Sequence, residues 1–144
     1  MNLPPKLSIV LPCYNEAQSL PEILSQFDRF KEKRGFELVL VNNGSTDNTA
    51  QVLASELPKY SFARLVLVAQ NQGYGFGLMQ GILSANGETI AFTHADLQTP
   101  PEDVFLAFEK LKQSPNPQKT LVKGKREGRG LQANAITFFM GFMS

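Results

Sequence analysis

Residues 7–16 of the chain, LSIVLPCYNE, join a short apolar run to a polar segment with proline, tyrosine, asparagine and glutamate. Apolar runs of this kind lie at Leu7–Leu11, Phe36–Val41, Ala63–Ala69, Glu88–Thr93 and, more weakly, Thr120–Lys123. Continuous hydrophobicity, as opposed to alternation, is typical of strands that are covered on both faces. The runs therefore predict an α/β protein with a parallel sheet and helices on both sides.

Longer segments with a helical pattern separate the apolar runs. The first helix is expected to begin with Ser19 as a hydroxyl cap, with Pro21 and Glu22 in its first turn. It should run to about Lys33, with Gly35 ending it. Further helices are expected at 47–57, at 76–86 and after the start signal Thr99–Glu102. The resulting β-α-β-α-β-α-β-α order predicts a doubly wound sheet of the nucleotide-binding type.

The composition fits one globular domain over residues 1–144, since the chain is 42% hydrophobic and 19% charged. A net charge of +1 gives no field for binding nucleic acid through its phosphates, so a general nucleic-acid binder is disfavoured. Cys13 is the only cysteine, which excludes an internal disulfide and a cysteine-cluster metal site and favours the reducing cytoplasm. The N-terminus lacks the pattern of a secretory signal, and the stretch Ala135–Met143 is about half of the ~20 residues needed to span a bilayer.

Four polar or glycine-rich segments follow the first four apolar runs: Pro12–Glu16, Asn42–Asp47, Asn71–Gly77 and His94–Gln98. In doubly wound sheets, ligands bind beyond the carboxyl ends of the strands, where these segments are expected to meet. Taken alone, each has an ordinary explanation as a turn or a helix cap, and Gly73–Gly77 does not match the dinucleotide fingerprint GxGxxG. Their common location at one edge of the sheet favours a binding site.

The motifs SIVLPCYNE, LVLVNNGSTDNT and NQGYGFGLMQGILSANGETIAFTHADLQTPPEDV resemble the nucleotide-binding half of family 2 glycosyltransferases of the GT-A fold. The resemblance is closest to the dolichyl-phosphate mannose synthase-like and bacterial polyprenyl-phosphate sugar transferase branch, and it covers almost the whole chain. It implies a GT-A-type, mainly parallel sheet that carries the donor half of such an enzyme. The acceptor half is largely absent, so the chain is expected to be truncated at its C-terminus or completed by another chain.

The resemblance also implies which residues bind the nucleotide sugar. They are Pro12, Tyr14, Glu16, Asn42, Asn43, Asn71, Gly73, Gly75, Ala95 and Asp96, with Gly77 completing the glycine-rich segment. Asn42 stands where the family usually has an aspartate that reads the base. An asparagine still accepts a hydrogen bond from a ring N–H but without charge assistance, so altered base selection is expected.

The family's metal motif, DxD, reads His94–Gln98 in this chain. The resemblance implies Asp96 and Gln98 as ligands of Mg²⁺ or Mn²⁺, with Asp96 and His94 as the catalytic residues. One carboxylate together with substrate phosphates is a usual arrangement for Mg²⁺. His94 replaces the first aspartate, and three roles stay open for it: a hydrogen bond to ribose, a hydrogen bond to phosphate, or ligation of Mn²⁺.

A basic, glycine-rich segment follows the last apolar run. Its cations Lys123, Lys125, Arg126 and Arg129 are candidates for binding the diphosphate or the acceptor phosphate. The alternative is an ordinary solvated loop. The apolar residues from Leu131 to Met143 are expected to form a helix, either in the core or at a membrane surface.

The resemblance implies an inverting glycosyltransferase that uses a UDP- or GDP-linked sugar, a divalent metal and a polyprenyl-phosphate acceptor. The alternative is a non-catalytic nucleotide-binding module or a truncated remnant of such an enzyme. The expected location is cytoplasmic, with a peripheral position at the inner face of the membrane if the acceptor is a lipid. Exposed apolar surface on the C-terminal helix would favour a homo-oligomer or another partner chain.

Overall fold

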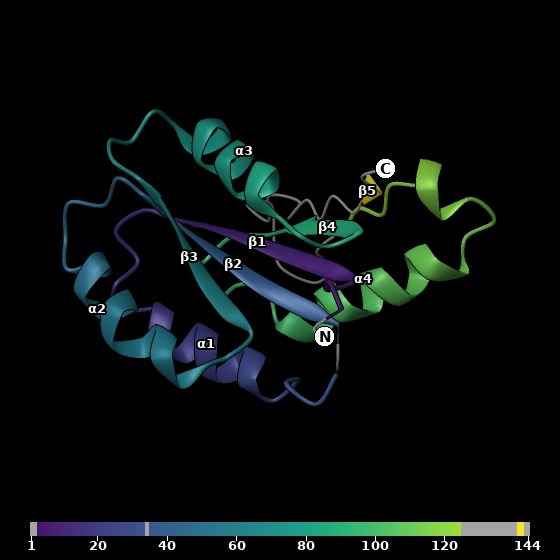
Figure 1. The fold of residues 1–144 in the computed structure, drawn as a ribbon, viewed down its shortest axis with the longest axis horizontal. Coiled ribbons are helices and arrows are strands. Elements are labelled where there is room, and N and C mark those ends of the chain that lie inside the picture. Colours follow the sequence, from purple (N-terminus) through teal and green to yellow (C-terminus); the bar gives the residue numbers. More distant parts are fainter. Residues whose placement is uncertain (1–2, 34, 125–140, 143–144) are drawn as a thin grey trace, which may run out of the picture.

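The computed structural model describes residues 3–33, 35–124 and 141–142. In chain order its elements are β1 (Leu7–Cys13), α1 (Leu20–Asp28), β2 (Phe36–Asn43), α2 (Thr49–Glu56), the 3-10 helix η1 (Leu57–Lys59), β3 (Ala63–Val68), α3 (Tyr74–Ser84), β4 (Thr89–Phe92), α4 (Pro101–Gln113), the 3-10 helix η2 (Pro117–Lys119) and β5 (Gly141–Phe142). The strands form one sheet in the order β3-β2-β1-β4-β5 (Figure 1). The first four are parallel and β5 is antiparallel to β4, which confirms the predicted α/β class with a mainly parallel sheet.

β1 is the centre of the sheet, and every residue in it is buried. It pairs with β2 from Leu7 opposite Phe36 to Cys13 opposite Asn42, and on its other side with β4. Because β1 to β4 all run in one direction, the segments that follow them emerge at the same edge of the sheet. This edge is where the sequence predicts the binding site.

Helices cover both faces of the sheet, as predicted. α1, α2 and α4 lie on one face and α3 lies on the other (Figure 1). The two cores follow the alternation of β1: Ile9 and Leu11 pack in the cluster that includes α1 and α4, whereas Val10 packs with residues of α3. α3 sits so close to the sheet that a Cβ at Gly81 would lie 2.4 Å from Val10 Cγ1, so a larger residue there would force α3 or the buried Val10 to move. None of the helices in the described part of the chain has the length and apolarity needed to cross a membrane.

α1 differs from its prediction at both ends. Ser19 has the αR backbone rather than the extended conformation of a capping residue, and its side chain makes no capping hydrogen bond. The helix ends at Asp28 rather than near Lys33, because the chain continues in tight turns such as that from Phe30 N–H to the Phe27 carbonyl. These turns bring the ring of Phe30 to 4.8 Å, centroid to centroid, from Phe105 of α4.

Three further predictions of elements were wrong. The N-cap position of α4 is occupied by Pro100, in an extended conformation, and not by Thr99 as predicted. The weak run Thr120–Lys123 is not a strand, since β4 pairs with β5 on the side that such a strand would occupy. The expected C-terminal helix is wrong at Gly141–Phe142, which form β5, while residues 125–140 and 143–144 lie outside the described residues.

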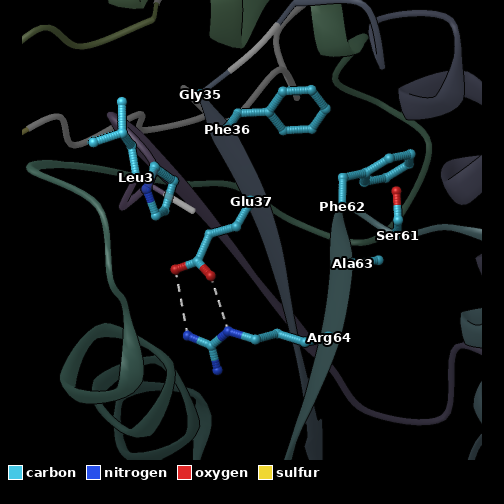
Figure 2. Close-up of a pocket in the computed structure, with 9 residues that line it drawn as sticks. Leu3, Gly35, Phe36, Glu37, Ser61, Phe62, Ala63 and Arg64 are labelled. Carbon is cyan, nitrogen blue, oxygen red and sulfur yellow. Dashed lines mark hydrogen bonds and ion pairs between the residues drawn. The ribbon is translucent and has the colours of Figure 1, made fainter. Parts of the chain in front are cut away.

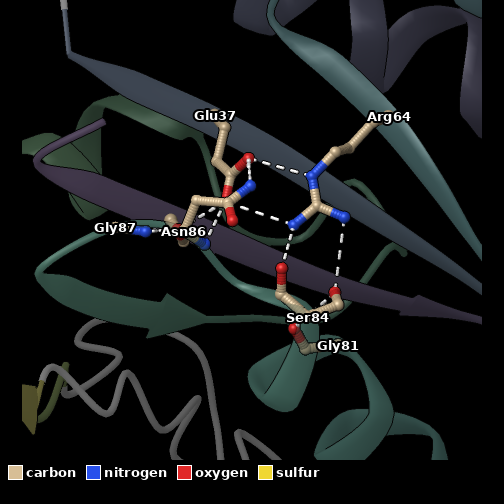
Figure 3. Close-up of polar contacts among 7 residues, drawn as sticks. Glu37, Arg64, Gly81, Ser84, Asn86 and Gly87 are labelled. Carbon is tan, nitrogen blue, oxygen red and sulfur yellow. Dashed lines mark hydrogen bonds and ion pairs between the residues drawn. The ribbon is translucent and has the colours of Figure 1, made fainter. Parts of the chain in front are cut away.

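A polar network ties the strands together at the amino end of the sheet, opposite the predicted site (Figure 3). The carboxylate of Glu37 on β2 accepts hydrogen bonds from Ser8 Oγ at 2.7 Å and from Asn86 N–H at 2.8 Å. Arg64 of β3 donates to Glu37 through Nε at 2.9 Å and also donates to the Ser84 carbonyl at the end of α3.

A cavity of about 260 Å³ opens beside this network, lined by Leu3, Phe36, Glu37, Phe62 and Arg64 among others (Figure 2). Its two charged side chains bind each other and their neighbours in the network. The cavity therefore presents no unpaired charge to a ligand, and the network acts as a structural tie between strands and helix.

Candidate functional site

The four segments after β1 to β4 contact one another at the carboxyl edge of the sheet. The β1–α1 segment binds the β2–α2 segment through Asn15. The β2–α2 segment touches the β3–α3 segment at Gly44 and at Asn43. The β3–α3 segment reaches the residues after β4 through Tyr74. The edge is thus one continuous surface, because Tyr74 at the start of α3 links the β3–α3 segment to residues after β4 although β2 and β1 separate these two strands in the sheet.

Asn15 joins the first two segments. Its φ of 54° is left-handed, a conformation that asparagine tolerates better than most residues. In this position its Oδ1 accepts hydrogen bonds from the backbone N–H of Thr46 at 2.8 Å and of Asp47 at 3.2 Å. Its own N–H donates to Ser45 Oγ at 3.1 Å. Sequence reasoning did not single out Asn15, although its place within the PCYNE motif was a signal.

In the first segment Tyr14 is exposed, Glu16 is half-buried and Pro12 is buried. Tyr14 is 46% exposed, so its ring is accessible to a ligand. Burial raises the pKa of Glu16, and the negative charges of Asp96 and Asp47 raise it further. A hydrogen bond with Ser19 lowers this pKa but does not outweigh the other effects. Glu16 therefore lies within electrostatic reach of two other carboxylates.

Both predicted asparagines at the end of β2 are buried and bound to the protein. Asn42 is 4% exposed, and its Oδ1 accepts a hydrogen bond of 3.3 Å from Ser45 N–H. Asn43 is 2% exposed, and its Nδ2 donates to the Gly73 carbonyl at 3.1 Å. Next to them, Gly44 has a φ of 67°, and a Cβ there would lie 2.2 Å from Asn71 N. The second and third segments are therefore in close backbone contact.

The glycine-rich segment is exposed from Asn71 through Gly75. Asn71 Oδ1 accepts a hydrogen bond of 2.7 Å from Gly73 N–H, and Gly73 has a φ of 100°. Tyr74 then begins α3, and its ring stacks on the imidazole of His94 with centroids 5.3 Å apart and planes inclined by 28°. Burial, and to a smaller degree the charge of Asp96, raises the pKa of Tyr74. Sequence reasoning missed Tyr74, since no local pattern reveals a stacking partner.

The residues after β4 place one carboxylate at the centre of this surface. Ala95 is buried, while His94 is exposed and Asp96 is half-buried. Asp96 Oδ1 accepts a hydrogen bond of 3.1 Å from the backbone N–H of Gln98. Leu97 between them has a φ of 62°, an uncommon conformation for a leucine, and outliers of this kind are concentrated at functional sites.

The donor set suits a hard divalent cation that is shared with a bound ligand. Among residues 3–33 and 35–124, no group of three or more histidine, cysteine, aspartate or glutamate side chains is arranged to hold a metal ion by itself. The half-buried Asp96 carboxylate nevertheless adds to a negative potential that acts on Glu16 and Tyr74. A cation would relieve this potential, with phosphate oxygens of a ligand completing its coordination.

The predicted phosphate-binding cations are not brought together with Asp96 by any contact within the described residues. Lys123 is exposed in the irregular segment that follows η2, and η2 contacts β5 at the far edge of the sheet. The other three, Lys125, Arg126 and Arg129, lie outside the described residues.

Comparisons with known proteins agree with this architecture. Residues 8–136 match the family model of glycosyl transferase family 2. The undecaprenyl-phosphate 4-deoxy-4-formamido-L-arabinose transferase of Klebsiella pneumoniae (strain 342) is 37% identical over 109 residues, which are 73% of this chain and 33% of that protein. The chain thus spans about a third of the length of this relative.

Two solved structures share the fold at 26% sequence identity. The mannosyltransferase PcManGT from Pyrobaculum calidifontis, in complex with GDP-Man and Mn²⁺, superposes with a TM-score of 0.72 over 87% of this chain and 37% of its own. S. aureus TarS 1–349, in complex with UDP-GlcNAc, superposes with a TM-score of 0.66 over 88% of this chain and 36% of its own. Both are GT-A glycosyltransferases, so the chain has the α/β fold of that class.

Proposed function

The chain belongs to glycosyl transferase family 2, and we propose that it forms the donor-binding part of an inverting enzyme that transfers a sugar from a nucleotide diphosphate to a polyprenyl phosphate. The observation that carries the proposal is the Asp96 carboxylate, whose charge acts on Glu16 and Tyr74 where the four strand ends meet. The Klebsiella relative is named for an undecaprenyl-phosphate acceptor, and PcManGT was crystallised with GDP-Man and Mn²⁺. These names supply the substrate classes of the proposal.

In this proposal Asp96 and Gln98 hold Mg²⁺ or Mn²⁺ against the diphosphate. The cation, when bound, neutralises charge that develops on the leaving diphosphate. Tyr14 and Glu16 lie along the base and ribose, while Gly73 and Gly75 let the ligand approach the backbone. The remaining donor contacts are assigned to Asn71 and His94, which are exposed, with the buried Pro12, Asn42, Asn43 and Ala95 forming the layer behind them. His94 and Asp96 are the catalytic residues of the proposal, next to the diphosphate.

The proposed acceptor needs positioning more than deprotonation. A phosphate monoester has its second pKa near ~6, so its oxygen is already largely ionised at neutral pH. That oxygen attacks the sugar carbon opposite the leaving diphosphate, and the configuration inverts. We assign the acceptor phosphate to Lys123, Lys125, Arg126 and Arg129, and the reaction to the cytoplasmic face of a membrane. The proposal also includes association with a second copy of the chain or with another chain.

A non-catalytic nucleotide-binding module is the second candidate. It is favoured by Asn42, whose side-chain oxygen is bound to Ser45 N–H instead of being free to read a base. It is favoured also by His94 at the position where the metal motif has its first carboxylate.

Calorimetric titration of UDP and GDP, each with Mn²⁺, Mg²⁺ or EDTA, tests both candidates. We expect one nucleotide to bind only with metal and its affinity to fall at least ~10-fold in Asp96→Asn, about 1.4 kcal/mol. Asp103→Asn, which removes an exposed carboxylate of α4, is the matched control. Binding without transfer to a polyprenyl phosphate would favour the second candidate. If the folded protein bound neither nucleotide, both candidates would fail.

A further inference from the structure

Asn43 has almost no surface to offer a ligand, although the family resemblance includes it in the nucleotide site. It is 2% exposed at the end of β2. Its Nδ2 donates to the Gly73 carbonyl at 3.1 Å, while its Oδ1 is buried without a partner within the described residues. Its amide therefore reaches the exposed edge only through the backbone of Gly73.

The amide of Asn43 is also held by close contact with α3. A Cβ placed on Gly77 would lie 2.5 Å from Asn43 Cγ and 2.6 Å from its Nδ2, so the amide rests on the backbone of the first turn. The Gly73 carbonyl accepts a second hydrogen bond, from Gly77 N–H at 3.3 Å. Asn43 thus fixes the orientation of the Gly73 peptide, in which Gly73 has a φ of 100°.

The peptide that Asn43 holds leads directly into Tyr74. The ring of Tyr74 stacks on His94 at 5.3 Å, centroid to centroid, next to Asp96 in the sequence. A contact path therefore runs from the end of β2, through the start of α3, to the residues after β4. An apolar side chain would fill the position of Asn43 without leaving a buried acceptor unpaired. The hydrogen bond that Asn43 Nδ2 donates to the Gly73 carbonyl is therefore the reason for an asparagine at this position.

We propose that Asn43 is a positioning residue, which holds Tyr74 through the Gly73 carbonyl and thereby orients the ring of His94. The consequence for nucleotide binding rests on the proposed function, because His94 lies at the proposed donor site. The path itself is a property of the free protein and can be measured without any ligand.

His94 is the only histidine of the chain, so its imidazole gives one resolved set of NMR signals. In the wild-type protein we expect nuclear Overhauser cross-peaks between the ring protons of His94 and Tyr74. Asn43→Leu keeps the branching at Cγ and the number of side-chain heavy atoms, and it removes the unpaired acceptor together with the donor. We expect it to abolish these cross-peaks and to shift the His94 signals in the same direction as Tyr74→Leu, with no further shift in the double variant.

Two glycine substitutions provide an independent test. Gly77→Ala places a methyl group against the Asn43 amide, whereas Gly75→Ala, in the same turn of α3, meets nothing within 4 Å. Alanine favours helix over glycine, so a weaker helix does not explain an effect. We expect Gly77→Ala, and not Gly75→Ala, to weaken the cross-peaks.

The proposal is overturned if Asn43→Leu and Gly77→Ala keep the wild-type cross-peaks, or if the wild-type protein shows none. Should Asn43→Leu not fold, Gly77→Ala decides alone. Calorimetric titration of UDP and GDP separates the proposal from the function. Loss of the stack in these variants supports the path even if the wild-type protein binds no nucleotide, and that result would count against the function alone.

Discussion

Replacing Glu37 with glutamine should remove the tie at the amino end of the sheet with little change in side-chain shape. The carboxylate accepts hydrogen bonds from Ser8 Oγ, Asn86 N–H and Arg64 Nε at 2.7 to 2.9 Å. A glutamine keeps one acceptor oxygen and turns an NH₂ group toward the remaining donors. It also leaves the Arg64 guanidinium without its counter-ion.

The expected loss follows from these contacts. A hydrogen bond to a charged group contributes about 1.5–3 kcal/mol, and Glu37→Gln removes at least one. The side chain of Glu37 is 12% exposed, but that of Arg64 is 34% exposed and regains water, which limits the penalty. We therefore expect a decrease of about 2 kcal/mol in the free energy of unfolding, or roughly 6 °C in Tm.

The effect should depend on pH. Burial raises the pKa of Glu37, but the hydrogen bonds from Arg64, Asn86 and Ser8 outweigh burial, so its pKa lies below the ordinary value. A group with a lowered pKa in the folded state stabilises the protein above its unfolded pKa, and this contribution is lost as the pH falls through the folded pKa. The difference between wild type and Glu37→Gln should therefore be largest near neutral pH and shrink in acid.

Urea unfolding followed by far-UV circular dichroism, at several pH values, measures this difference. Glu109→Gln is the matched control, since Glu109 pairs with Lys112 on the surface at 2.8 Å and such pairs contribute at most ~1 kcal/mol. If Glu37→Gln were no less stable than Glu109→Gln, or if its deficit were the same in acid as at neutral pH, the role assigned to the network would be refuted.

Three further predictions concern the carboxyl edge of the sheet. Gly44→Ala should lower the free energy of unfolding, measured in urea, by at least ~2 kcal/mol, because Gly44 has a φ of 67° and a Cβ there would lie 2.2 Å from Asn71 N. An unchanged midpoint of urea unfolding would contradict this close contact between Gly44 and Asn71. Burial, and secondarily the charge of Glu16, raises the pKa of the Cys13 thiol. Cys13 should therefore resist a thiol reagent in the native protein and react with it in guanidinium chloride. Rapid reaction of Cys13 in the native protein would show that the thiol is accessible and would contradict this prediction. Burial and then the charge of Asp96 raise the pKa of Glu16, so Asp96→Asn should lower it in a carboxyl NMR titration; no change would mean that the two groups do not interact.

The strands of this fold could be predicted because their signal is local. The predicted runs beginning at Leu7, Phe36 and Ala63 start where β1, β2 and β3 start. β1 and β2 extend further than predicted, to Cys13 and Asn43, since the parallel ladder continues into residues that follow the apolar run. Continuous hydrophobicity marks the part of a strand that is covered on both faces, and it does not mark where pairing ends.

The details of the candidate site depended on contacts between distant segments. The stack of Tyr74 on His94 exists because α3 and the end of β4 meet at one edge, and neither residue carries a local mark of it. Likewise, Asn42 and Asn43 occupy the expected positions, but their amides bind the protein. A motif identifies which residues reach an edge of the sheet, whereas the direction of each side chain is decided by packing.

The strand order also has a consequence for how the chain acquires its fold. β1 is central, but β4, its second neighbour, is made after β2 and β3. Synthesis proceeds at ~5–20 residues per second, so the backbone N–H and C=O groups on one edge of β1 remain unpaired for several seconds until β4 is made. Such an edge can pair with another chain. Before β4 emerges from the ribosome, the nascent chain can therefore aggregate through this edge of β1.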